Sequence, residues 1–146
     1  MVLITEVQGA VEPAVLAGKA RDTLCLAWEE RRWTRKRLTT TAGREVALAL
    51  PTGSVLEPGA VLAVAAEWYL AVEARPEPVL AVFPESYERA VLVAFEVGNR
   101  HFTVAMDGDV LLVPDDLATE QLLRRLGVRW ERRQAVYTPV GGDADD

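Results

Sequence analysis

Two prolines at alternate positions, in the segment Arg75-Pro76-Glu77-Pro78, divide the chain into halves of different pattern. Each proline removes a backbone donor and favours extended backbone, so no helix is expected to continue through this segment. The chain has 146 residues, enough for one ordinary domain or two small ones. We therefore predict two domains, residues 1–74 and 75–140, followed by a short acidic and disordered tail at 141–146.

In the first half, short apolar stretches alternate with turn residues. Three turn signals contain Gly or Pro: Ala42-Gly43-Arg44, Pro51-Thr52-Gly53 and Glu57-Pro58-Gly59. Short apolar runs between such signals are typical of strands, so we predict an all-β domain. The expected strands are Val2–Val7, Leu24–Trp28, Arg37–Thr41, Val46–Leu50, Val61–Ala65 and Tyr69–Ala74.

The second half begins with a strand at Val79–Phe83 and an amphipathic helix that Ser86 can cap. We expect Gly98 and Asn99 to end this helix, because both residues tolerate left-handed backbone. The apolar positions at helical spacing are Tyr87, Ala90, Val91, Ala94 and Phe95.

Two further strands, a second helix and a last strand complete the second half. The strands His101–Met106 and Asp109–Val113 are joined at Asp107-Gly108, a hairpin signal. Asp115 or Asp116 caps the second helix, Gly127 ends it, and Arg129–Thr138 is the last strand. We expect four residues of this helix to face inward: Ala118, Leu122, Leu123 and Leu126. The resulting βαββαβ order predicts a ferredoxin-like domain and an α+β chain.

Composition and charge exclude several classes of protein. The net charge of −6 disfavours nucleic-acid binding, because phosphates would repel the chain. The single cysteine, Cys25, permits no intramolecular disulfide, and we expect it to be a small buried core residue. No apolar run approaches the ~20 residues of a membrane span, and no charged leader follows Met1. We expect a soluble cytoplasmic protein that binds neither nucleic acid nor membrane.

The only histidine of the chain, His101, closes the tetrad Gly98-Asn99-Arg100-His101 at the end of the first predicted helix. A single imidazole binds a metal ion weakly. Two imidazoles, one from each of two identical subunits related by a two-fold axis, form the beginning of a metal site. The alternative is a capping histidine whose cation meets the negative end of the helix dipole.

Several segments of both halves, together with the tetrad, match one known family. They are Arg35–Leu38, Gly43–Val46, Leu50–Gly53 with Val55-Leu56, Gly59–Leu62, Val97–His101 and Leu122–Gly127. On these residues the chain resembles the UreE family of urease accessory proteins, which are nickel metallochaperones. The tetrad is the most specific part of the match.

The resemblance implies a peptide-binding-like β domain followed by a ferredoxin-like domain for metal binding and dimerisation. It implies a homodimer in which His101 of both subunits holds nickel, with Gly98, Asn99 and Arg100 supporting the turn or the interface. It also implies delivery of nickel to apo-urease together with the urease GTPase and its partner proteins, without catalysis by this chain. The resemblance also allows two dimers to associate around a shared ion.

The chain departs from the family pattern in two places. Its tail at 141–146 has no histidine, and Asp115-Asp116 stands where members often carry further histidines. A single interfacial site remains, and water, Asp115, Asp116 or a partner protein could complete its ligand shell. Imidazole suits nickel, zinc and copper alike, so zinc or copper could also bind in vitro.

Two groups of basic residues have no role in this interpretation. The first group surrounds Trp33, and either a solvated strand edge or a site for an acidic partner would explain it. It consists of Arg31, Arg32, Arg35, Lys36 and Arg37. The second group suits the exposed faces of the last helix and strand, and consists of Arg124, Arg125, Arg129, Arg132 and Arg133.

Two rival functions remain beside the nickel carrier. One is a peptide-binding or assembly module for urease maturation in which metal binding is incidental. The other is a small enzyme, which is disfavoured because acid–base and nucleophilic groups are scarce, and a Cys25–His101 pair would have to bridge the two domains.

Overall fold

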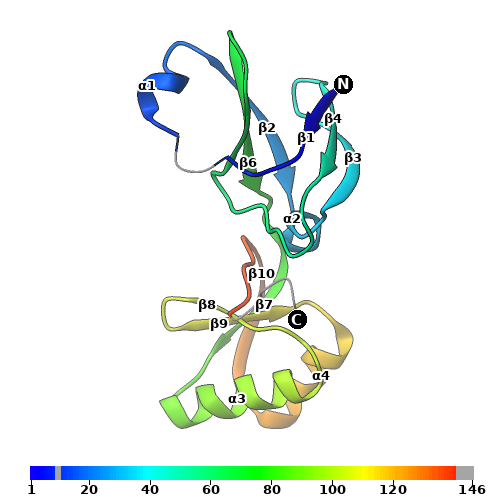
Figure 1. Cartoon of the computed structure of the whole chain (residues 1–146). Coiled ribbons are helices and arrows are strands. Elements are labelled where there is room, and N and C mark those ends of the chain that lie inside the picture. Colours follow the sequence, from blue (N-terminus) through cyan, green and yellow to red (C-terminus); the bar gives the residue numbers. More distant parts are fainter. Residues whose placement is uncertain (9–10, 141–146) are drawn as a thin grey trace. The chain divides into compact units, whose positions relative to one another are not determined.

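The structure, a computed structural model, describes residues 1–8 and 11–140 (Figure 1). The chain divides into a first unit, Met1–Arg75, and a second unit that starts at Pro76. The predicted acidic tail at 141–146 lies outside the described residues. Within the described ranges, no helix is long and apolar enough to cross a membrane.

The first unit contains two three-stranded sheets, ordered β1-β4-β3 and β2-β6-β5. Within them, β1 pairs with β4 and β2 with β6 in parallel, and the other pairs are antiparallel. Both sheets contribute to one core, in which Val46 and Leu70 are fully buried. The bounds are β1 Val2–Ile4, β2 Ala20–Leu26, β3 Arg35–Thr39, β4 Glu45–Ala49, β5 Val61–Val64 and β6 Trp68–Ala74. The predicted β domain is therefore confirmed.

Two four-residue helices, α1 (Pro13–Leu16) and α2 (Trp28–Arg31), interrupt this β pattern. The predicted strand Leu24–Trp28 was wrong at both ends, because β2 begins at Ala20 and stops at Leu26, and α2 begins at Trp28. The Glu30 carboxylate accepts a hydrogen bond from the Ala27 N–H at 2.8 Å, which satisfies a donor at the start of the helix.

The prediction that Cys25 is buried was also wrong, since its side chain is exposed. Leu24 and Leu26 on either side of it are buried in the core. Successive side chains of a strand point to opposite faces, so the residue between two inward leucines must point outward.

A buried carboxylate, Asp22, ties β2 to the turn between β3 and β4. It accepts hydrogen bonds from Thr40 Oγ1 at 2.5 Å, a guanidinium nitrogen of Arg44 at 2.9 Å and the Ala42 N–H at 3.0 Å. Burial raises the pKa of Asp22, but these bonds outweigh it and lower the pKa from 3.8 to about 2. The network therefore stabilises the unit above the ordinary pKa and loses this effect as the pH falls through about 2.

The second unit has the predicted ferredoxin-like order. Its antiparallel sheet is ordered β10-β7-β9-β8. Side chains of both helices pack with alternate residues of the sheet into one core, so the helices cover one face (Figure 1). The bounds are β7 Glu77–Phe83, α3 Tyr87–Asn99, β8 Ala105–Asp107, β9 Val110–Pro114, α4 Leu117–Leu126 and β10 Arg129–Ala135.

Three details of the second unit differ from expectation. The strand predicted at His101–Met106 is only β8, Ala105–Asp107, and β10 ends at Ala135. On α4, Ala118 is exposed and Thr119 is buried in its place. The Thr119 hydroxyl donates to the Pro114 carbonyl at 2.6 Å, which satisfies this polar group inside the unit.

Candidate metal site

The helix that leads to His101 begins as predicted. Ser86 precedes α3, and its side-chain oxygen accepts a hydrogen bond from the Arg89 N–H at 3.2 Å. Val93 and Val97 are fully buried in the core of the second unit. The helix is therefore held at its start by a cap and along its length by these two residues.

The helix ends two residues later than expected. Gly98 and Asn99 are helical, and the residue with left-handed backbone is His101, with φ of 65°. The His101 N–H donates to the Gly98 carbonyl at 2.9 Å and the Phe102 N–H to the Val97 carbonyl at 3.2 Å. These two bonds form a Schellman motif, and Phe102 packs against the same core as Val97.

A histidine at this position is unusual. Glycine is the common residue where a Schellman motif needs left-handed backbone, because a Cβ there is strained by about 1–2 kcal/mol. Among the described residues, His101 is the only residue other than glycine with positive φ. Its side chain is exposed. The chain thus places a solvent-facing imidazole where another residue would give a more stable turn, a pattern found at functional sites.

Arg100 is anchored to its own helix. One guanidinium nitrogen donates to the Glu96 carboxylate at 2.7 Å and to the Glu96 carbonyl at 3.1 Å. This nitrogen therefore binds one of the last carbonyls of α3, which otherwise lack partners near a helix end.

The two candidate carboxylates have separate partners. Asp116 caps α4 by accepting the Ala118 N–H at 2.8 Å. A carboxylate oxygen of Asp115 lies 3.7 Å from a guanidinium nitrogen of Arg132. The described residues contain no group of three or more His, Cys, Asp or Glu side chains that could hold a metal ion. Within that part of one chain, His101 is therefore not joined to a ready-made ligand set.

The outward face of α3 is apolar and contains three of the five apolar positions at the predicted helical spacing, whereas the buried residues Val93 and Val97 were not among those five. Tyr87, Val91 and Phe95 follow one another at intervals of four and are 93%, 67% and 65% exposed. Met106 of β8 is 60% exposed and lines a hollow of about 360 Å³ together with Tyr87 and Ala90. We call Tyr87, Val91, Phe95 and Met106 the α3 apolar face.

Gly98 continues this face toward the end of the helix. It follows Phe95 by three residues, so the two positions lie on the same side of α3. A Cβ built on Gly98 would meet no atom within 4 Å. Packing within the described chain does not require a glycine here, and the helix interior would be more stable with alanine.

Comparison with known proteins agrees with this architecture. Residues 4–75 match the model of the UreE urease accessory protein N-terminal domain, and residues 77–146 match the C-terminal domain model of the same family. A urease accessory protein UreE of Synechococcus sp. (strain JA-3-3Ab) is 41% identical over 116 residues, which is 78% of each chain. Its counterpart in Deinococcus radiodurans is 42% identical over 108 residues, 74% of this chain and 70% of that protein. The chain belongs to the UreE family of urease accessory proteins.

Proposed function

We propose that this protein carries nickel for the assembly of urease and has no catalysis of its own. Two copies associate through their second units, and His101 of each copy binds the same nickel ion. The observation that carries this proposal is the exposed imidazole of His101 in left-handed backbone, directly after a helix with an uncovered apolar face.

The chemistry of imidazole supports a site that binds and releases its metal. The neutral imidazole is a good ligand for nickel, and also for zinc and copper. Two imidazoles leave the coordination shell incomplete, so water, Asp115, Asp116 or a partner protein supplies the other ligands. An incomplete protein shell suits a carrier, because the receiving protein can replace the remaining ligands one by one.

The α3 apolar face supports association of two copies. Contiguous exposed apolar side chains on a protein of this size indicate an interaction surface. Gly98 extends the face with a position that has no side chain, so a second backbone can approach closely there. The same surface thus leads along α3 to the turn that carries His101. Pairing of two dimers around a shared ion would be seen in the mass of the metal-loaded protein.

The proposed partners are the urease GTPase and the apo-urease accessory complex, which would receive the nickel. The family assignment supports a role in urease maturation. If the first unit alone recognises these partners and metal binding is incidental, replacement of His101 will leave partner binding unchanged.

Nickel titration calorimetry combined with light scattering tests this proposal. The native protein, His101→Gly and the control Asp109→Asn, a carboxylate in the β8–β9 turn, are compared. We expect about one nickel ion per two chains, or per two dimers, for the native protein and the control. We expect no such binding by His101→Gly, which still forms dimers through the α3 apolar face.

Three results would contradict the nickel-carrier proposal. Unchanged nickel binding by His101→Gly would place the metal elsewhere in the chain. Absence of binding by the native protein would favour the assembly module. A monomeric native protein would remove the interface on which the shared site depends.

A further inference from the structure

Three residues of the first basic group, Arg35, Lys36 and Arg37, lie on an open edge of the first unit, whereas Arg31 is buried in α2 and Arg32 follows it at the helix end. In the sheet β1-β4-β3, the strand β3 is terminal, and no other strand of the described residues pairs with its free side (Figure 1). Arg35, Lys36 and Arg37 form the first three residues of β3, and all three are exposed. The segment Arg31–Arg37 holds five of the 16 Lys and Arg residues of this acidic chain.

The free side of β3 presents unpaired backbone groups next to two of these arginines. The Thr40 N–H donates to the Arg44 carbonyl and the Leu50 N–H to the Thr34 carbonyl, each at 2.8 Å. Hydrogen-bonded pairs alternate in an antiparallel ladder, so even-numbered residues of β3 bond to β4. The N–H and C=O groups of Arg35, Arg37 and Thr39 therefore point away from β4, toward the open edge.

The open stretch is short and well defined. Just beyond β3, the Thr41 N–H donates to the Thr23 carbonyl of β2 at 3.0 Å, which closes the edge there. At the other end, β3 begins at Arg35. An added strand of about five residues would cover the free edge between these two points.

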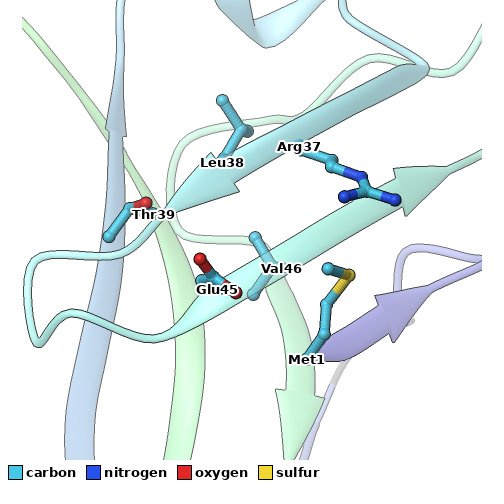
Figure 2. A pocket seen from close by; sticks show the side chains of 6 residues that line it. All are labelled: Met1, Arg37, Leu38, Thr39, Glu45 and Val46. Atoms are coloured by element: carbon cyan, nitrogen blue, oxygen red, sulfur yellow. The ribbon is translucent and has the colours of Figure 1, made fainter.

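The charges of Arg35 and Arg37 are not neutralised by any residue within the described ranges 1–8 and 11–140. Arg35 and Arg37 form no ion pair or side-chain hydrogen bond with any residue that the structure describes. Glu45 aligns with Thr39, two residues along β3 from Arg37 and on the same face (Figure 2), and it forms no ion pair with Arg37. By contrast, arginines of the second basic group are engaged locally: Arg133 with Glu131, and Arg132 with Glu120.

The outer face of this sheet also carries an exposed apolar residue on β1, the strand at the opposite edge from β3. Leu3 of β1 is 65% exposed and aligns with Ala47 of β4, which aligns with Arg37. Met1, Arg37 and Thr39 border a hollow of about 270 Å³ (Figure 2). In an added strand, the side chains beside Arg35 and Arg37 lie on this outer face, and the alternate side chains lie on the inner face with Leu38, which packs against the core. A segment that alternates acidic and apolar residues therefore matches this edge.

We propose that the free edge of β3 binds an extended acidic segment of a partner protein by strand addition. Its backbone bonds to Arg35, Arg37 and Thr39, and its carboxylates meet the guanidinium groups of Arg35 and Arg37. This site lies entirely in the first unit and does not depend on nickel, so it can fail without affecting the proposed metal site.

A defined peptide probe tests the proposal on the full-length protein. The probe is an eight-residue peptide of alternating Val and Glu with blocked ends, and amide hydrogen exchange is followed residue by residue. We expect the peptide to protect the Arg35 and Arg37 amides. The Lys36 amide, already bonded to β4, should change little.

Two matched controls separate strand addition from simple charge attraction. An alternating Glu-Pro peptide has the same charge, but proline lacks the N–H needed for a ladder, so it should bind weakly. The double variant Arg35→Glu/Arg37→Glu should bind the Val-Glu peptide about tenfold more weakly. Arg21→Glu/Arg125→Glu makes the same charge change at two other exposed arginines and should bind it as the native protein does.

Several results would overturn the proposal. Equal binding of the Glu-Pro peptide would indicate charge attraction alone. Failure of the Val-Glu peptide to protect Arg35 and Arg37 would leave the basic residues as a device against edge-to-edge pairing. Protection of the same amides by a single-stranded oligonucleotide, but not by the peptide, would assign the edge to nucleic acid.

Discussion

The two helices of the second unit contrast in how completely the chain itself satisfies them. In α4, Asp116 caps the start, Leu122 and Leu123 are buried, and Gly127 takes the left-handed position at the end. In α3, Ser86 caps the start and Val97 is buried in the core. Its outward side is apolar, however, and its left-handed residue is His101.

The contrast indicates where α3 departs from what stabilises a single chain. A helix at a surface normally has polar residues outward and glycine at the left-handed position. Apart from Leu117, its first residue, which is 67% exposed, α4 follows this pattern. The two departures of α3 are its exposed apolar side and the histidine in the turn at its end. Neither improves packing within the unit. We infer that they serve an association that includes a second copy of the chain.

The largest expected effect is on dimerisation, and it compares substitutions on the outward faces of α3 and α4. Phe95→Glu should raise the dimer dissociation constant at least ~30-fold, equivalent to about 2 kcal/mol, because a carboxylate would be buried in the interface. Gln121→Glu, on the exposed side of α4, should leave the dimer intact. Sedimentation analysis measures both. An unchanged dimer in Phe95→Glu would show that the α3 apolar face is not the interface.

Substitutions at the two left-handed positions, His101 and Gly127, should change the free energy of unfolding in opposite directions. His101→Gly should raise the free energy of unfolding by about 1 kcal/mol, since glycine adopts this backbone without strain. Gly127→Ala, at φ of 69°, should lower it by about 1 kcal/mol. Urea unfolding with a chelator present measures both without a contribution from bound metal. A loss of stability in His101→Gly would mean that the imidazole itself stabilises the turn.

The smallest expected effect on stability is that of Asp116→Asn, which distinguishes the role of Asp116 as a helix cap from a role as a metal ligand. Asp116→Ala should lower the free energy of unfolding by about 1 kcal/mol, while Asp116→Asn, an equally good cap, should leave it within about 0.3 kcal/mol of the native value. We expect the nickel affinity of Asp116→Asn to equal that of the native protein. A lower affinity with unchanged stability would identify Asp116 as a ligand as well as a cap.

Much of the fold could be predicted from local signals. Turn residues such as Gly108 and caps such as Ser86 and Asp116 act within a few residues, so their effect is visible in the chain. The exposure of Cys25 could have been recognised from strand alternation between Leu24 and Leu26. The helix at Trp28 could not, because β2 and α2 follow one another without a glycine or proline between them.

The sequence by itself determined the order of elements in the second unit, the starts of its two helices, the family and the candidate histidine. Only the tertiary structure decided which apolar stripe of α3 is buried and which residue turns left-handed. The physical reason is that Val93 and Val97 have the same helical periodicity as Val91 and Phe95, and only the sheet beneath the helix selects between them. Likewise, the packing of Phe102 against that core sets the point where the chain leaves the helix, and it places His101 in the turn.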